Sequence, residues 1–289
     1  MRTKAGCTVQ RMTKINQDTA ILIPKILQEI NIYQFSVCDG HGEYGHLVSQ
    51  YIKNNFPKIL YKYLKENDTQ ITPDYIKNSI LSATKQTNQE IFQSNIDSYL
   101  SGSTFVSVFI HENKLYCSNA GDSRAIVGKQ TKGASNFFFQ NISTDHKPNL
   151  EREKFRILKA GGRIQQQRDL SGQPIGPLRV WQFKNDIPGL AMTRSLGDKA
   201  AAIAGVICEP EIYEMDIQDE DKFIIVASDG VWEHLNDQFV TNIVGQFYNK
   251  GDCDLAAEKL MIESIKSWKK ESFCRDDITC IVIFLNKNS

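Results

Sequence analysis

The chain has 289 residues, of which 41% are hydrophobic and 24% are charged, and its 34 basic side chains balance 34 acidic ones. This composition is typical of a soluble globular protein that buries a sizeable core. The zero net charge argues against nucleic acid or a membrane as an obligatory partner, since both attract basic surfaces, and no apolar run is long enough to span a bilayer.

The first part of the chain alternates between strand and helix patterns. Residues 32–38 form an apolar, β-prone run that stops at Asp39. Apolar residues then recur with helical spacing over 44–64, where Pro57 is expected to kink or interrupt the helix. A second helix is predicted over 72–91, because it opens with a capping hydroxyl, a proline and an acid.

Strand patterns dominate the middle of the chain. Residues 105–110, 115–119 and 124–127 are apolar runs separated by short polar turns, which predicts an antiparallel meander. A short helix is predicted over 150–159, ended by two glycines. Residues 165–189 hold three prolines, three glycines and few periodic apolar residues, so we expect a surface loop or flap there.

The last part returns to one strand, two helices and a final strand. Their predicted ranges are 223–227, 236–248, 252–269 and 278–285, and the final strand is apolar throughout, as expected when both faces are covered. Strands in hairpin succession, interrupted by helix pairs, predict antiparallel sheets covered by helices. A doubly wound parallel fold would need strict strand–helix alternation, which the middle of the chain breaks.

Seven cysteines stand singly, with no Cys-x-x-Cys pair. This pattern predicts neither a zinc site nor a disulfide framework, and it fits a reducing compartment. The first residues also lack the apolar core of a secretory signal, so we expect a cytoplasmic protein, with the nucleus as the alternative. No repeat or linker divides residues 1–289, which we expect to form one domain, a monomer by default.

Acidic turns adjoin three of the apolar strands. They contain Asp39, Asp229 and Asp276, and a fourth turn contains Asp122. Asp-Gly is a common turn dipeptide, and each turn alone is more often structural than catalytic. Several carboxylates buried together, however, are costly unless a cation neutralises them. All-oxygen ligation suits Mg²⁺ or Mn²⁺, so the sequence predicts a metal site.

Two such ions can polarise a phosphoryl group and activate a water that attacks phosphorus in line. The sequence contains no Cys-x₅-Arg cradle for a cysteine nucleophile. His41, two residues after Asp39, can donate a proton to the leaving alkoxide. The alternative for His41 is a turn residue bonded to the backbone.

Nine short stretches, in order and at the expected approximate spacing, resemble the metal-dependent protein phosphatases of type 2C over nearly the whole chain. They are Asn16-Gln17-Asp18, Val37-Cys38-Asp39-Gly40-His41-Gly42, Gly102-Ser103-Thr104, Asn119-Ala120-Gly121-Asp122-Ser123-Arg124, Asp145-His146-Lys147-Pro148, Gly189-Leu190-Ala191-Met192-Thr193-Arg194-Ser195-Leu196-Gly197-Asp198, Glu209-Pro210-Glu211, Ser228-Asp229-Gly230-Val231-Trp232-Glu233 and Arg275-Asp276-Asp277.

The resemblance implies an α+β fold, a four-layer α-β-β-α sandwich with two antiparallel β-sheets flanked by helices. It implies hydrolysis of phosphoserine and phosphothreonine in protein substrates, with the loop 165–189 as the flap beside the active site. The implied roles are Asp39 bridging two Mg²⁺ or Mn²⁺ ions, the Gly40 carbonyl on one of them, Asp229 and Asp276 completing the other, Asp122 at a third, weaker position, Asp18 and Gln17 as further metal-site residues, and His41 as the general acid.

Two departures from the family pattern concern metal and phosphate binding. Many members have Glu where this chain has Gln17, and an amide can hold a metal-bound water but adds no negative charge. The Arg that often binds substrate phosphate is here Thr13. Arg11 would lie on the same strand face and can take that role, because a guanidinium suits phosphate oxygens. The alternative for Arg11 is a solvated surface residue.

Two other functions compete with an active phosphatase. Gln17 and Thr13 favour a catalytically dead phosphatase-like domain that binds a partner. Retention of five site residues argues against it, because a dead domain has no chemical need for them: Asp39, Gly40, His41, Asp229 and Asp276. An unrelated two-metal hydrolase, such as a nuclease, should show a basic channel, and the neutral net charge weakens that interpretation.

Overall fold

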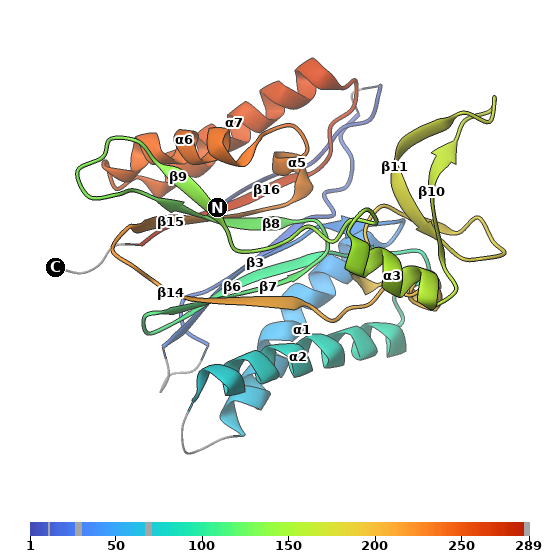
Figure 1. The fold of residues 1–289 in the computed structure, drawn as a ribbon, viewed down its shortest axis with the longest axis horizontal. Helices are drawn as coiled ribbons and strands as arrows, with labels where there is room; N and C mark the ends of the chain where they lie inside the picture. Colours follow the sequence, from blue (N-terminus) through green and yellow to red (C-terminus); the bar gives the residue numbers. More distant parts are fainter. Residues whose placement is uncertain (11, 27–30, 67–70, 286–289) are drawn as a thin grey trace.

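Two five-stranded sheets face each other in the computed structural model, which describes residues 1–10, 12–26, 31–66 and 71–285 (Figure 1). Every pairing within them is antiparallel. The first sheet has the order β1 (Arg2–Lys4), β16 (Ile278–Phe284), β15 (Asp221–Ala227), β8 (Arg124–Lys129) and β9 (Phe138–Asn141). The second has the order β14 (Glu211–Asp216), β7 (Lys114–Ala120), β6 (Phe105–His111), β3 (Ile32–Cys38) and β2 (Thr19–Ile23).

The space between the sheets is filled by small and branched apolar side chains from both. Alternate residues of a strand point to opposite faces, so each central strand gives one set to this core and another to the helices outside. The shared core includes Val37, Val106, Val108, Cys117, Ala125, Val127, Ile224, Val226 and Ile281.

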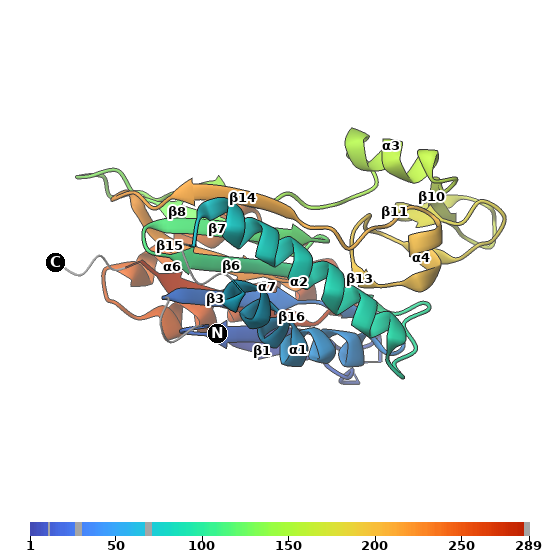
Figure 2. The ribbon, with the colours of Figure 1, turned by 90° about the horizontal axis from the view of Figure 1, so that it is seen from below.

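Helices cover the outer face of each sheet (Figure 1), and the view from below in Figure 2 shows the helix pair that lies on the second sheet. The helices α1 (Gly45–Lys65) and α2 (Pro73–Gln93) bury their apolar faces against the second sheet, and α6 (Asp237–Tyr248) and α7 (Cys253–Glu271) cover the first. The predicted start of α2 is confirmed, because the Thr72 side chain accepts a hydrogen bond from the backbone N–H of Tyr75.

The expected interruption at Pro57 is wrong, because α1 continues through this residue. Proline removes one helical N–H and disfavours the preceding turn. The neighbouring Phe56, Ile59 and Leu60 are buried in the core against the second sheet. Burial of this apolar face outweighs the local cost of the proline.

Two three-stranded sheets lie at one end of the molecule. One contains β10 (Arg163–Arg168), β11 (Pro174–Trp181) and β12 (Pro188–Leu190), and the other contains β13 (Leu196–Gly197), β5 (Gly102–Ser103) and β4 (Gly40–His41). The strands β10 and β11 form a hairpin that projects from the body beside α3 (Glu151–Lys159) (Figure 1). The expected irregular loop at 165–189 is therefore largely strand, and its mostly exposed polar residues gave no alternating signal.

The predicted mixture of helices and antiparallel strands is confirmed. The strands β1, β2, β9 and β14 were not predicted, because they lie at sheet edges and few of their residues are buried. Two short helices, α4 (Lys199–Ile203) and α5 (Asp229–Trp232), complete the fold. None of the described helices is long and apolar enough to cross a membrane.

Candidate active site

Five of the predicted aspartates adjoin strand ends of the two facing sheets. Asp39 follows β3, Asp122 lies between β7 and β8, and Asp229 follows β15, while Asp276 and Asp18 precede β16 and β2. Their charges act on one another. Burial, followed by the charges of the other four aspartates, raises the pKa of Asp39 well above its usual range. The structure therefore brings these five carboxylates close enough for the other four to act on Asp39.

Much of this negative charge is buried without compensation. Burial raises the pKa of Asp18 to about 7, although hydrogen bonds from Thr279 and Ser228 oppose the shift. The pKa of Asp229 is also raised well above its usual range, by burial first and then by Asp122 and Asp276. One carboxylate oxygen each of Asp18, Asp122 and Asp229 is buried and lacks a hydrogen-bond partner.

Two lysines reach the carboxylates, and the sequence analysis assigned a role to neither. Lys147 donates to Asp122, and the Nζ atom of Lys14 lies 3.1 Å from Oδ1 of Asp276. Burial disfavours the charge of Lys147, but Asp122, Asp229 and Asp145 together keep its pKa raised. These two cations offset only part of the charge of the five aspartates.

The donors at this site fit a hard divalent cation. Uncompensated buried carboxylate oxygens favour a cation, and only oxygen donors are involved. Within the described ranges, no group of three or more His, Cys, Asp or Glu side chains is arranged to enclose a metal ion. Mg²⁺ does not need such a cage, because it is commonly bound through one or two carboxylates and keeps several waters.

Hydrogen bonds join the segment around Gln17 to the turn that follows β3. Asp277 accepts from the N–H of Gly6 at 2.6 Å and from the N–H of Gln17 at 2.8 Å, so it ties together the segments around the site. Gln17 in turn accepts from the N–H of Gly40 at 3.2 Å. A side chain at Gly40 would meet the Gly45 carbonyl oxygen at 2.4 Å, so the close approach requires glycine.

The Gln17 side chain is bonded within the same turn system. Its Nε2 atom donates to the Gly42 carbonyl oxygen at 2.7 Å. This leaves the amide oxygen of the side chain to accept a hydrogen bond from a water. Arg11, the predicted phosphate-binding residue, lies outside the described residues.

His41 is paired with a carboxylate that the sequence analysis quoted but gave no role. Its Nε2 atom lies 2.7 Å from Oδ2 of Asp198, and its Nδ1 atom is buried without a partner. The nearby charges of Asp122 and Asp229 contribute to the electrostatic environment of the ring. His41 is therefore more than a turn residue bonded to the backbone.

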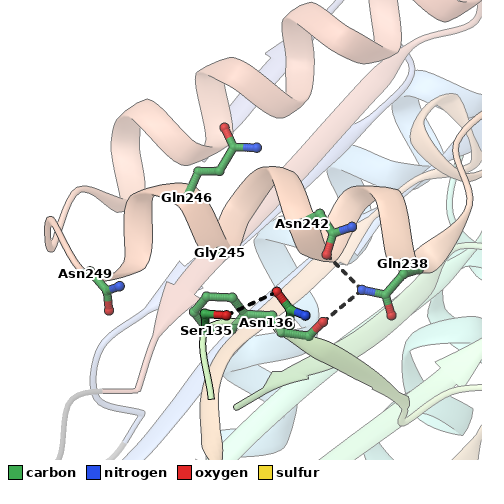
Figure 3. A pocket seen from close by; sticks show the side chains of 8 residues that line it. Ser135, Asn136, Gln238, Asn242, Gly245, Gln246 and Asn249 are labelled. Atoms are coloured by element: carbon green, nitrogen blue, oxygen red, sulfur yellow. Dashed lines mark hydrogen bonds between the residues drawn. The ribbon is translucent and has the colours of Figure 1, made fainter. Parts of the chain in front are cut away.

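A separate hollow lies away from the carboxylate cluster and offers different chemistry (Figure 3). It has a volume of about 670 Å³ and separates the segment before β9 from α6. Its lining contains no charged side chain and no nucleophile apart from a serine hydroxyl: Ser135, Asn136, Phe137, Gln238, Asn242, Gly245, Gln246 and Asn249. Acid–base or metal chemistry belongs to the carboxylate cluster and not to this hollow.

Comparisons with known proteins agree on one family. A family model described as "Protein phosphatase 2C" matches residues 4–272. The chain is 31% identical over 294 residues to "Probable protein phosphatase 2C 73" of Arabidopsis thaliana, covering 95% of this chain and 77% of that relative. It is 32% identical over 288 residues to "Probable protein phosphatase 2C 34" of the same plant, with coverage of 95% and 78%.

Solved structures share the fold at lower sequence identity. The serine-threonine phosphatase 2C from Toxoplasma gondii superposes with a TM-score of 0.83 at 20% identity, covering 99% of this chain and 93% of that one. A bacterial serine phosphatase superposes with a TM-score of 0.65 at 18% identity, covering 100% and 97%.

Proposed function

Because the chain belongs to the protein phosphatase 2C family, we propose that its carboxylate cluster hydrolyses phosphoserine and phosphothreonine in proteins with the help of two divalent cations, Mg²⁺ or Mn²⁺. Membership makes the chain a serine/threonine phosphatase. The observation that supports the metal site is the set of buried, unpartnered carboxylate oxygens on Asp18, Asp122 and Asp229.

Each predicted residue has a proposed role at this cluster. Asp39 would be shared by the two cations, the Gly40 carbonyl oxygen would help to hold one, and Asp229 and Asp276 would help to hold the other. Asp122 serves a third, weaker position, where Lys147 competes for its carboxylate. Asp18 and Gln17 lie further out, Asp18 by orienting its neighbours through Ser228 and Gln17 by holding a water.

The cations, when bound, would polarise the phosphoryl group and activate the attacking water. The chain's own residues supply the rest. Lys14, whose Nζ atom lies 3.1 Å from Oδ1 of Asp276, would be available to bind a phosphate oxygen at this edge of the cluster. His41 supplies a proton to the leaving alcohol, since an alkoxide is otherwise a poor leaving group.

The same proposal covers architecture and cellular setting. We infer a four-layer α-β-β-α sandwich over residues 1–289, with the projecting hairpin as the flap, and a monomer that acts on phosphorylated proteins in the cytoplasm or nucleus. A nuclease is disfavoured, because the chain is neutral and offers no excess of basic residues for a polyanion. A dead phosphatase-like domain is disfavoured, because every proposed metal ligand is retained.

The test is phosphate release from a phosphothreonine peptide with Mn²⁺, with Mg²⁺ and with excess EDTA. Asp229→Ala should lose at least about 10²-fold in turnover, since several kcal/mol of charge stabilisation disappear with the cation. Asp221→Asn is the matched control, because Asp221, at the start of β15, is a buried carboxylate paired with Lys129 of β8. Turnover that persists in EDTA or in a folded Asp229→Ala variant would contradict the proposal.

A further inference from the structure

We propose that Asp198 is a positioning residue for His41, and that His41 therefore gives its proton to the leaving alcohol from the Nδ1 atom. The inference rests on the proposed phosphatase function. Its starting point is the contact between Nε2 of His41 and Oδ2 of Asp198 at 2.7 Å, with the Asp198 side chain only 2% exposed. A buried carboxylate with one histidine partner fixes both the orientation and the protonated nitrogen of that ring.

The three-stranded sheet of β4, β5 and β13 brings the two residues together from distant parts of the chain. His41 on β4 and Gly197 on β13 are both register partners of Gly102 on the central strand β5. The His41–Asp198 bond therefore crosses over Gly102. A Cβ atom at that position would lie 2.1 Å from Oδ2 of Asp198, so only glycine leaves room for the contact.

The backbone of Asp198 is held in an uncommon conformation. Its φ of 52° and ψ of 52° are left-handed, and Glu112 is the only other described non-glycine residue with positive φ. Asp tolerates this conformation better than most residues. The N–H of Asp198 donates to the Ser101 carbonyl oxygen at 2.9 Å, which secures the turn. Such conformations are retained mainly where function needs them.

The Asp198 side chain is diverted from its usual structural role. It stands just before α4, where an aspartate commonly caps the helix, yet it makes no capping bond. Its Oδ2 atom instead accepts from the Ser195 hydroxyl at 2.5 Å and faces His41. Two hydrogen bonds to one oxygen fix the carboxylate in the direction of the imidazole.

This arrangement decides which nitrogen can transfer a proton. A neutral imidazole has one N–H, and the carboxylate keeps it on Nε2. The proton of the cationic form that can leave is then the one on Nδ1, which is buried and has no partner in the described part of the chain. When water attacks phosphorus, the bond to the leaving oxygen breaks with its electron pair. That oxygen takes the Nδ1 proton, the attacking water gives up one proton to solvent, and neutral His41 takes up a proton again after the alcohol has left.

The first experiment compares two substrates of different leaving-group basicity in Asp198→Asn. A phosphothreonine peptide releases an alcohol that needs a proton, whereas p-nitrophenyl phosphate releases a phenolate that does not. We expect kcat on the peptide to fall about 10²-fold or more, the usual contribution of general acid catalysis, and kcat on p-nitrophenyl phosphate to change less than about threefold. His41→Gln should give the same pattern, and the double variant should lose no more than either single one.

Asp221→Asn serves as the control, because it alters a buried carboxylate with a different partner, Lys129. It should show no difference between the two substrates. Equal losses on both substrates in Asp198→Asn, or additive losses in the double variant, would show that Asp198 acts only on the fold and would overturn the proposal.

A second readout is independent of turnover. Nitrogen-15 NMR of the imidazole in the metal-free protein should find His41 with its neutral-form proton on Nε2, and should find this preference lost in Asp198→Asn. Gly102→Ala should have the same effect, because its methyl group displaces Asp198. An unchanged tautomer in both folded variants would overturn the pairing. Failure of the wild-type protein to hydrolyse either substrate would refute the phosphatase function instead, and the NMR result would still decide the pairing.

Discussion

The aspartates of the cluster illustrate a conflict between function and stability at single residues. Burial and neighbouring aspartates raise the pKa of Asp18, Asp39 and Asp229, so the ionised cluster destabilises the metal-free fold. A pKa unit corresponds to about 1.4 kcal/mol. The carboxylates that would attract a cation are therefore the ones whose neutralisation should relieve electrostatic repulsion in the metal-free protein.

We predict that Asp229→Asn stabilises the metal-free protein while removing activity. The amide keeps the shape of the side chain and deletes one buried charge, so the melting temperature should rise by about 2 °C or more. Added Mg²⁺ should raise the melting temperature of the wild type and have little effect on the variant. Thermal scans with EDTA and with Mg²⁺ measure both effects.

The control is again Asp221→Asn, for which the melting temperature should fall instead of rise. Asp221 is paired with Lys129 at 2.9 Å, so its neutralisation leaves a largely buried ammonium without its ionic partner, although Gln140 still accepts from it. A metal-free Asp229→Asn variant that melts below the wild type would contradict the idea that repulsion among the ionised aspartates destabilises the metal-free protein.

Sequence patterns indicated four of these aspartates because each stands in a recognisable turn, whereas Asp18 was named only through the family resemblance. Asp198 and Lys14 escaped assignment for a physical reason. Their roles depend on contacts across 157 and 262 residues of chain, with His41 and Asp276, and no local periodicity encodes such contacts. The Asp198 side chain also stands at a helix start, where capping is the simpler expectation.

At the scale of elements, a buried ion cluster links α3 to the segment between β12 and β13. Glu153 is fully buried, and both of its oxygens face the Arg194 guanidinium, at 2.7 and 3.1 Å. Arg156 donates to it at 2.8 Å and Thr193 at 2.7 Å. Burial alone would raise the pKa of Glu153, but these bonds outweigh it and hold the pKa far below the usual value of 4.5.

This shift predicts an acid-sensitive contribution to stability. A carboxyl group with a depressed folded-state pKa contributes fully above its unfolded pKa, about 4.3, and loses the contribution as pH falls below it. Glu153→Gln should therefore lower the free energy of unfolding by roughly 3 kcal/mol at neutral pH, as for a broken buried ion pair. The difference from wild type should shrink steadily below about pH 4.

Urea unfolding at several pH values measures this difference. The matched control is Glu263→Gln on α7, where Lys259 and Lys266 lower the pKa of a more accessible carboxyl. Its removal should cost about 0.5 kcal/mol, because surface ion pairs contribute little. A wild-type minus Glu153→Gln difference that stays constant from neutral to acid pH would argue against a charged Glu153 in the fold.

Elements with one buried face were predicted well, and elements without one were not. The helices α1 and α2 and the strands β3, β6 and β15 show apolar spacing that follows directly from packing on a sheet. The hairpin of β10 and β11 satisfies its backbone hydrogen bonds while exposing most side chains, so its sequence shows neither period. A strand that is hydrogen-bonded but not buried produces no periodic pattern of apolar residues in the sequence.

For the molecule as a whole, the decisive feature is that the two large sheets share one core. Residues from both sheets pack in the same apolar cluster. The first sheet is complete only when β1, at the amino terminus, pairs with β16, near the carboxyl terminus. Neither sheet can then lose its inner face without exposing that of the other. We expect the two layers to unfold as one cooperative unit.

The prediction is tested with Ile224→Ala on β15. Ile224 is fully buried between the sheets, so the truncation should lower the free energy of unfolding by about 2–5 kcal/mol. The loss should appear equally in two probes. Far-UV circular dichroism is dominated by the long helices of both layers, whereas tryptophan fluorescence reports mainly on Trp232 and Trp268 beside the first sheet. Coincident transitions at a lower midpoint are expected, and a fluorescence transition that precedes loss of helix would show instead that the first sheet unfolds independently.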